Sequence, residues 1–336
     1  MGVELGSLVL GEKKDISSFA ERAIAIDAHN TLYQFLSIIR QPDGTPLMDN
    51  EGRITSHLSG LFYRTANLVE AEIKPVYIFD GVPPVLKSST IEGRVKIRNK
   101  AREEWLTAIE AGDIELARMK AQQASHLTKE MVEEAKELLN YLGIPWIQAP
   151  SEGEAQASYM NKIGKVWATA SQDYDSLLFG AKILIRNLTI TGKRKLPRRK
   201  EYVQIFPEEI VLENLLLNLG ITNEQLIEIG ILIGTDYNEG IKGIGPKKAL
   251  KLLKEFGSLE KIFKEKGWFI DGYEEIKRIF SQPEVTNKFE FSLKAPCFEK
   301  VKEYLCEKHN FSEDRVESAL KKFPEEKKQI TLDKWF

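Results

Sequence analysis

Three short apolar runs in the first half of the chain are each followed by aspartates. In chain order they are residues 23–26 before Asp27, residues 76–79 before Asp80, and residues 166–170 before Asp173 and Asp175. Short β-prone runs of this kind are typical of buried strands. One Asp after a strand is commonly part of a polar turn. The repetition of the pattern raises a second interpretation, a shared acidic site.

Amphipathic helical patterns lie between these runs, for example residues 129–143, which Gly143 closes as a C-cap would. Strands that alternate with helices predict an α/β fold with a central, mainly parallel, twisted sheet and helices on both faces. The carboxyl ends of such strands are where ligands bind. Residues 82–135 look different, because their helical pattern is polar and charged, and we expect a helical insertion there. After residue 207 the chain looks mostly helical.

Two further sites add acids to the ends of apolar elements. Glu152 and Glu154 follow Ser151, a plausible helix N-cap, and Asp236 follows an apolar helical pattern in the segment that begins at residue 230. As first-turn residues the two glutamates could serve the helix dipole alone. If all seven acids share one cleft, they repel one another unless divalent cations neutralise them. All-oxygen ligands suit Mg²⁺ or Mn²⁺. Two such ions can hold both the attacking and the leaving oxygen of a phosphodiester during its hydrolysis.

The composition is that of a soluble globular protein, with 42% hydrophobic and 29% charged residues in 336. No apolar run approaches the ~20 residues that span a bilayer, and no signal peptide is visible. Cys297 and Cys306 are too few for a disulfide scaffold, and the four histidines match no zinc spacing. The net charge is −2, yet residues 87–102 and 193–200 are strongly basic. Each basic segment fits either a phosphate-binding surface or a solvated one.

A glycine-rich hairpin precedes an amphipathic helix near residue 246. Its glycines allow close approach to a phosphate, its helix start can hold the phosphate, and its lysines add charge. This pattern is typical of a helix-hairpin-helix, which grips a nucleic-acid backbone without reading bases. The residues expected to contact DNA there are Gly240, Ile241, Gly243, Ile244, Gly245, Lys247 and Lys248.

Five segments together resemble the flap endonucleases of the XPG family, most closely the archaeal members. They are IAIDA, VYIFDG, APSEGEA, SQDYDSLLFG and GTDYNEGIKGIGPKKA, in the family's order and spacing. The resemblance covers nearly the whole chain. It implies a structure-specific 5′ flap endonuclease with 5′-3′ exonuclease activity, acting on branched DNA in Okazaki fragment maturation and base excision repair. A catalytically inactive junction-binding adaptor of the sliding clamp is the alternative, although such an adaptor would be expected to lose several of the acids.

The resemblance also implies roles for individual residues. Two Mg²⁺ ions would be held by Asp80, Glu152 and Glu154 on one side and by Asp173, Asp175 and Asp236 on the other, with Asp27 acting through metal-bound water. Mn²⁺ would be able to substitute. Lys87 and Arg94, in the helical arch at about 82–135, would contact the scissile phosphate. Tyr33 would stack on a base, or alternatively pack on its own helix.

Other segments have counterparts in the family as well. Residues 38–61 match a hydrophobic wedge between the two duplex arms, and residues 230–263 match the helix-hairpin-helix, where Gly240, Ile241 and Ile244 would hold K⁺. Residues 1–323 would form a single nuclease domain. The tail 324–336 would bind the sliding clamp, PCNA, through Gln329, Leu332, Trp335 and Phe336.

Two features depart from the family pattern. His29 stands where relatives commonly carry a smaller or aliphatic residue, and no basic tail follows Phe336. The second departure favours a cytoplasmic, nucleoid-associated archaeal protein over a nuclear one. We expect the free protein to be a monomer without a membrane association.

Overall fold

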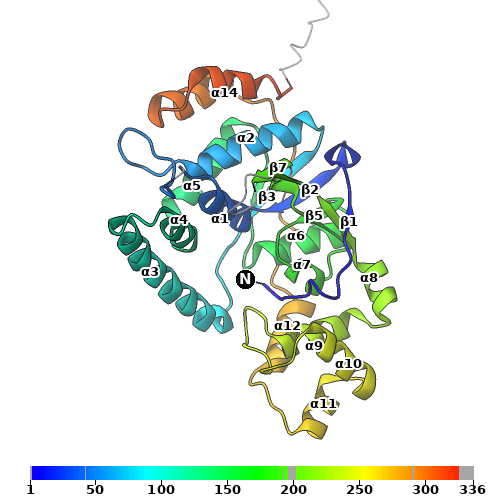
Figure 1. Cartoon of the computed structure of the whole chain (residues 1–336). Coiled ribbons are helices and arrows are strands. Elements are labelled where there is room, and N and C mark those ends of the chain that lie inside the picture. The colour runs from blue at the N-terminus through cyan, green and yellow to red at the C-terminus, as the bar shows by residue number, and fades with distance from the viewer. Residues whose placement is uncertain (1, 42, 191, 196–201, 290, 325–336) are drawn as a thin grey trace, which may run out of the picture.

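A seven-stranded sheet carries the fold of the chain, shown in Figure 1. The computed structural model describes residues 2–324 except for residues 42, 191, 196–201 and 290. In spatial order the strands of the sheet are β1 (Glu12–Lys13), β9 (Glu208–Val211), β6 (Ile183–Arg186), β5 (Ala168–Ala170), β2 (Ala23–Asp27), β3 (Lys74–Phe79) and β4 (Trp146–Gln148). A separate hairpin pairs β7 (Gly192–Lys195) with β8 (Tyr202–Ile205).

The five strands from β6 to β4 are parallel to one another, and β9 pairs in the antiparallel direction with both β6 and the edge strand β1. From β2 the chain proceeds to β3 and β4 on one side, then crosses to β5 and β6 on the other side. The strand order therefore reverses between β2 and β5. In open α/β sheets this reversal leaves a crevice at the carboxyl ends of the two strands, which is where ligands bind.

Helices cover both faces of the sheet. They are α1 (Ala28–Ile38), α2 (Ser56–Glu70), α3 (Ser88–Glu110), α4 (Ile114–Gln123), α5 (Lys129–Tyr141), α6 (Gly153–Lys162), α7 (Asp175–Leu178), α8 (Leu212–Leu219), α9 (Asn223–Ile233), α10 (Pro246–Phe256), α11 (Leu259–Lys266), α12 (Tyr273–Ser281), α13 (Phe298–Lys302) and α14 (Glu313–Leu320). Three short 3₁₀ segments are η1 (Ile16–Phe19), η2 (Val85–Lys87) and η3 (Leu188–Ile190), and η4 (Glu303–Lys308) is a π-helix.

Alternation along the strands sends side chains to two different cores. Ile24 and Ile26 of β2 pack with α1, α2 and α5, whereas Ala25 packs with α6. This period of two is what a strand buried on both faces requires. A third core joins the N-terminal residues Val3 and Leu5 to helices α8–α12. The predicted α/β fold, with a mainly parallel sheet and helices on both faces, is confirmed.

The polar insertion forms helices α3 and α4, which stand off to one side of the sheet in Figure 1. They pack on each other through small residues such as Ala101, Ala108 and Ala117, and leave Ile97 and Ile114 exposed. Helix α5 instead packs Met131, Ala135 and Leu138 into the main core. The expected insertion boundary at residue 135 therefore falls inside a core helix.

Among the described helices, none is individually long and apolar enough to cross a membrane. Only α8 and α9 together meet that criterion by length and composition, and the two are bent by 79° at their junction.

Candidate active site

Two acids lie where the strand order reverses. Asp27 is the last residue of β2 and the N-cap of α1, and its Oδ1 accepts the backbone N–H of Asn30 at 3.0 Å. Asp173 lies in the turn that follows β5, the strand beside β2. The crevice predicted from the topology thus has one carboxylate on each side.

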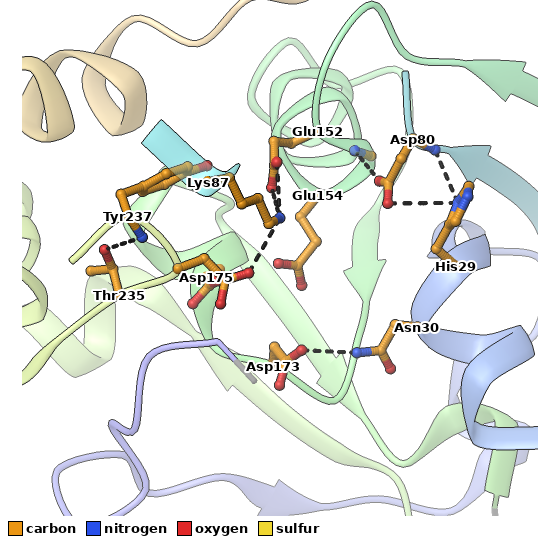
Figure 2. A network of polar contacts seen from close by, with 12 residues as sticks. His29, Asn30, Asp80, Lys87, Glu152, Glu154, Asp173, Asp175, Thr235 and Tyr237 are labelled. Atoms are coloured by element: carbon orange, nitrogen blue, oxygen red, sulfur yellow. Dashed lines mark hydrogen bonds and ion pairs between the residues drawn. The ribbon is translucent and has the colours of Figure 1, made fainter. Parts of the chain in front are cut away.

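The other five predicted acids converge on the same edge from separate elements. Asp80 follows β3, Glu152 is the N-cap of α6, Glu154 lies in the first turn of α6, Asp175 begins α7, and Asp236 follows α9. Figure 2 shows Asp80, Glu152, Glu154, Asp173 and Asp175 gathered around Lys87 and Asn30. Because each acid feels the charge of at least one other, all seven form a single electrostatic group.

Asp27 and Glu154 both lie in surroundings that disfavour the ionised carboxylate. Burial raises the pKa of Asp27 well above its usual range, and the charges of Asp80 and Asp173 raise it further. Burial likewise raises the pKa of Glu154, with added repulsion from Asp175 and Asp27. Carboxyls that disfavour their own ionised form in this way gain most from a neighbouring cation.

Asp175 and Glu152 show the same effect, partly offset by donors. Burial and the charges of Asp173 and Asp236 raise the pKa of Asp175 to about 7, although the Val3 N–H opposes the rise. Burial raises the pKa of Glu152, against the attraction of Lys87. Burial alone would lower the pKa of Lys87, but Glu152 and Asp236 outweigh burial and raise it.

Uncharged donors hold one oxygen of several acids. The backbone N–H of Gly153 donates to Asp80 Oδ1 at 2.7 Å, and that of Val3 donates to Asp175 Oδ1 at 2.6 Å. Asn30 Nδ2 donates to Asp173 Oδ2 at 2.9 Å, and Ser176 Oγ donates to Glu154 Oε1 at 3.3 Å. In each of these pairs the hydrogen bond holds one of the two carboxylate oxygens of the acid in place. Such outer contacts orient the carboxylates that ligate a cation.

Lys87 and Arg94, both predicted site residues, reach the acids from the base of the arch. Lys87 Nζ lies 2.7 Å from Glu152 Oε2 and 3.2 Å from Asp236 Oδ2, and Arg94 pairs with Asp236 Oδ1. Figure 2 shows the Lys87 side chain extended into the acidic group. A phosphate bound beside these acids would lie within reach of both cations.

The donor set fits divalent metal ions, since it consists of clustered carboxylate oxygens whose charges repel one another. Within the described residues, however, no three His, Cys, Asp or Glu side chains already stand in a metal-ligand arrangement. The ammonium of Lys87 lies between two of the acids instead. The acids are brought to one place, while their final approach to a cation would need side-chain rearrangement.

The predicted helix cap at Ser151 is wrong. Ser151 does not cap α6: Glu152 is the N-cap residue and makes no side-chain capping bond, because its carboxylate pairs with Lys87.

His29, which was not predicted as a site residue, lies at the site, where its Nδ1 accepts the backbone N–H of Asp80 at 3.1 Å (Figure 2). Its place two residues after Asp27 was the only sequence signal for this position.

The glycine hairpin joins α9 to α10. Gly240 has φ +70°, and a Cβ there would lie 2.4 Å from the backbone of Ile233 and Gly234. Ile241 and Ile244 pack inward against the third core. Gly243, at φ +81°, and Gly245 face open space, with Lys247 and Lys248 exposed beside them. The hairpin therefore presents backbone and positive charge outward.

Tyr33 and the predicted wedge lie on the arch side of the sheet. The Tyr33 hydroxyl accepts from Arg98 Nη1 at 2.8 Å, and its ring packs partly on the main core. In the wedge segment, Asp49 Oδ2 accepts from Arg53 Nε at 2.7 Å and lies 3.4 Å from His309 Nδ1. These contacts hold the segment against the C-terminal helices.

A cavity of about 290 Å³ lies between α2 and η3. Its lining includes Arg64, Asn67 and Thr189 and none of the seven acids.

The predicted clamp-binding residues, Gln329, Leu332, Trp335 and Phe336, lie outside the described residues.

Comparison with known proteins adds a second line of evidence. The XPG N-terminal domain profile matches residues 4–101, and the XPG I-region profile matches residues 143–236. Flap endonuclease 1 of Archaeoglobus fulgidus is 53% identical over 337 residues, covering all of both chains. This chain belongs to the flap endonucleases of the XPG family.

Solved structures agree with this membership. The flap endonuclease-1 structure from Methanococcus jannaschii matches 96% of this XPG-family chain and 97% of its own, with 43% identity and a TM-score of 0.76. The catalytic core of Rad2 in complex with a DNA substrate matches 95% of the chain with a TM-score of 0.71 and 24% sequence identity. At that identity the match supports the fold alone.

Proposed function

We propose that this chain is a structure-specific 5′ flap endonuclease, with 5′-3′ exonuclease activity, that hydrolyses DNA phosphodiesters at flap junctions. The observation that carries the proposal is the group of seven acids at the strand-order reversal, faced by Lys87 and Arg94 from the arch. Okazaki fragment maturation and base excision repair would supply such junctions. The full-length identity to archaeal flap endonuclease 1 supports the same activity.

Two Mg²⁺ ions, or Mn²⁺ in their place, would be held by Asp80, Glu152, Glu154, Asp173, Asp175 and Asp236, with Asp27 close by. When bound, the ions supply positive charge for the transferring phosphoryl group and lower the pKa of water. The chain's own part is to hold the carboxylates. Gly153 N–H fixes Asp80 and Val3 N–H fixes Asp175, so that these acids present a defined oxygen.

Lys87 and Arg94 supply the fixed positive charge for the reaction. Their charged ends lie at the acids already, so they can stabilise the phosphoryl oxygens without long movements. Ion pairing with Glu152 and Asp236 keeps Lys87 protonated, because those carboxylates raise its pKa. The positive charge is therefore in place over the whole neutral pH range.

The substrate duplex would be gripped away from the cut. Gly243 and Gly245 leave room for a phosphate at the start of α10, where Lys247 and Lys248 add charge. We propose that the backbone at Gly240, Ile241 and Ile244 holds a K⁺ ion between hairpin and duplex. Tyr33 would stack on the base near the cut, and residues 38–61 would separate the duplex arms. The tail would carry the clamp peptide, and the sliding clamp PCNA is its proposed partner.

A double-flap substrate with its 5′ end free or blocked tests the proposal. A flap endonuclease that threads the free end through the arch cuts the free substrate and not the blocked one. Cleavage of both would point to a nuclease of another specificity, and cleavage of neither to a junction-binding adaptor. Asp175→Asn should abolish cleavage in Mg²⁺ and leave flap binding within about tenfold, a change of ~1.4 kcal/mol or less. Cleavage by this variant near the wild-type rate would refute the ligand assignment.

A further inference from the structure

Asn30 contacts an acid on each side of the strand-order reversal. Its backbone N–H donates to Asp27 Oδ1 at 3.0 Å, and its side-chain Nδ2 donates to Asp173 Oδ2 at 2.9 Å, as Figure 2 shows for the second contact. Asp27 ends β2, and Asp173 follows β5. The two acids are 146 positions apart in the chain, and Asn30 is a direct bridge between their carboxylates.

The orientation of the Asn30 side-chain amide follows from the chemistry of its partner. A carboxylate only accepts hydrogen bonds, so the amide of Asn30 must turn its NH₂ group toward Asp173. The backbone N–H of Asn30 is one of the unpaired donors in the first turn of α1, and Asp27 takes it as N-cap. One residue thus gives each acid a donor without adding charge. A lysine in its place would neutralise a carboxylate that the proposed cations need.

The two hydrogen bonds of Asn30 hold Asp27 and Asp173 in place although their negative charges repel each other. The charge of Asp173 raises the pKa of Asp27, so the two ionised carboxylates push each other apart. The neighbours of Asn30 in the helix, Thr31 and Leu32, are buried and anchor the turn, whereas Asn30 itself is only partly buried. The contribution of its side chain is therefore mainly the bond to Asp173.

We propose that Asn30 is a positioning residue of the active site, which sets the separation of Asp27 and Asp173 across the crevice and thereby the site that receives the cations. The inference rests on the proposed function, because it treats both acids as members of the cation site. Asn30 itself touches neither cation nor substrate in this role. It fixes Asp173 Oδ2 through the amide Nδ2.

The test uses the full chain without DNA and measures Mn²⁺ binding by the loss of the free-ion electron paramagnetic resonance signal. Asn30→Leu removes the side-chain donor and keeps the backbone N–H to Asp27. Loss of such an outer contact should weaken Mn²⁺ binding about 10- to 100-fold. Asn30→Gln keeps an amide and should recover part of the affinity. Gln34→Leu, one turn later in α1, is the matched control, since Gln34 bonds Thr189 and none of the acids.

The same variants are then assayed for flap cleavage against Mg²⁺ concentration. Asn30→Leu should need more Mg²⁺ for half-maximal rate, with an unchanged KM for DNA. If Asn30→Leu proves poorly folded by thermal melting, Asn30→Ser, which is well tolerated in a first helical turn but too short to reach Asp173, replaces it. Mn²⁺ affinity and Mg²⁺ requirement equal to wild type in the folded variant overturn the inference.

Failure of the inference can be told from failure of the proposed function. If wild-type protein binds no Mn²⁺, or binds it equally after Asp175→Asn, the acids are not a cation site and the proposed function itself fails. If wild type binds Mn²⁺ in an Asp175-dependent way while Asn30→Leu binds it unchanged, only the role of Asn30 is lost.

Discussion

Asp175 accepts the backbone N–H of Val3 on one oxygen, and Gly2 lies against the same carboxylate. Val3 is buried in the third core, so the donor is held rigidly. A Cβ on Gly2 would stand 2.6 Å from Asp175 Oδ1 and 2.7 Å from its Cγ, which is closer than atoms can approach. The second residue of the chain therefore shapes an acid 173 positions away.

Gly2→Ala should displace the Asp175 carboxylate and weaken its role in the proposed cation site. We expect the Mg²⁺ concentration for half-maximal cleavage to rise about tenfold, the lower end of the range for outer contacts. The measurement is a Mg²⁺ titration of flap cleavage. Gly6→Ala is the control in the same segment, because a Cβ there meets its nearest atom, Tyr174 Oη, at 3.4 Å. Equal Mg²⁺ requirements for the two variants would show that Gly2 does not act on Asp175.

At the scale of elements, the sequence predicted those parts of the fold that have a local signature. Strand β2 is an apolar run that ends in Asp27, β3 is an apolar run followed by Asp80, and α5 is a strongly amphipathic helix. The edge strand β1 and its neighbour β9 carry charged residues such as Glu12 and Glu208, and they are held in the sheet because β9 pairs with both β1 and β6. Nothing in their own residues distinguishes them from loops, so they were not predicted.

The same distinction holds within the site. Each acid was predictable because it lies at one end of an apolar element, and the strands of a parallel sheet end at one edge. The donors were not, because Asn30 and Asp173 are separated by 143 residues and the Val3 donor is a backbone group. His29 stood out in the sequence only as a departure from the family pattern, and only the fold brings it to Asp80.

Gly243 of the hairpin is expected to matter in two ways: its backbone conformation favours glycine, and its backbone is proposed to contact DNA. Gly243 has φ +81° and open space where a Cβ would project, and so does Gly164, at φ +74°, in the connection between α6 and β5. Alanine at either position should cost about 1 kcal/mol of stability from the left-handed backbone. Only Gly243→Ala should also weaken duplex binding, by roughly tenfold or ~1.4 kcal/mol. Thermal melting and a fluorescence-anisotropy titration with duplex DNA measure the two effects, and equal DNA affinities would argue against backbone contact at Gly243.

On the scale of the whole molecule, the C-terminal helices belong to the same body as the sheet. Val316, Leu320 and Phe323 pack into the main core with residues of α2 and α5. The N-terminal segment similarly joins the third core through Val3 and Leu5. Both ends of the described chain therefore pack into its cores, and the single nuclease domain of residues 1–323 stays a prediction.

Two truncations test this boundary together with the proposed clamp peptide. A chain ending at residue 324 keeps Val316, Leu320 and Phe323, so its melting temperature and its cleavage of a flap should equal those of the full chain. A chain ending at residue 312 loses all three, at about 1.5–3 kcal/mol for each buried side chain, and should melt at a much lower temperature. Only the full chain should cut faster when an archaeal sliding clamp is added, because Gln329, Leu332, Trp335 and Phe336 are missing from both truncations. Clamp stimulation of the chain ending at 324 would place the contact elsewhere on the protein, and a loss of stability there would move the domain boundary into the tail.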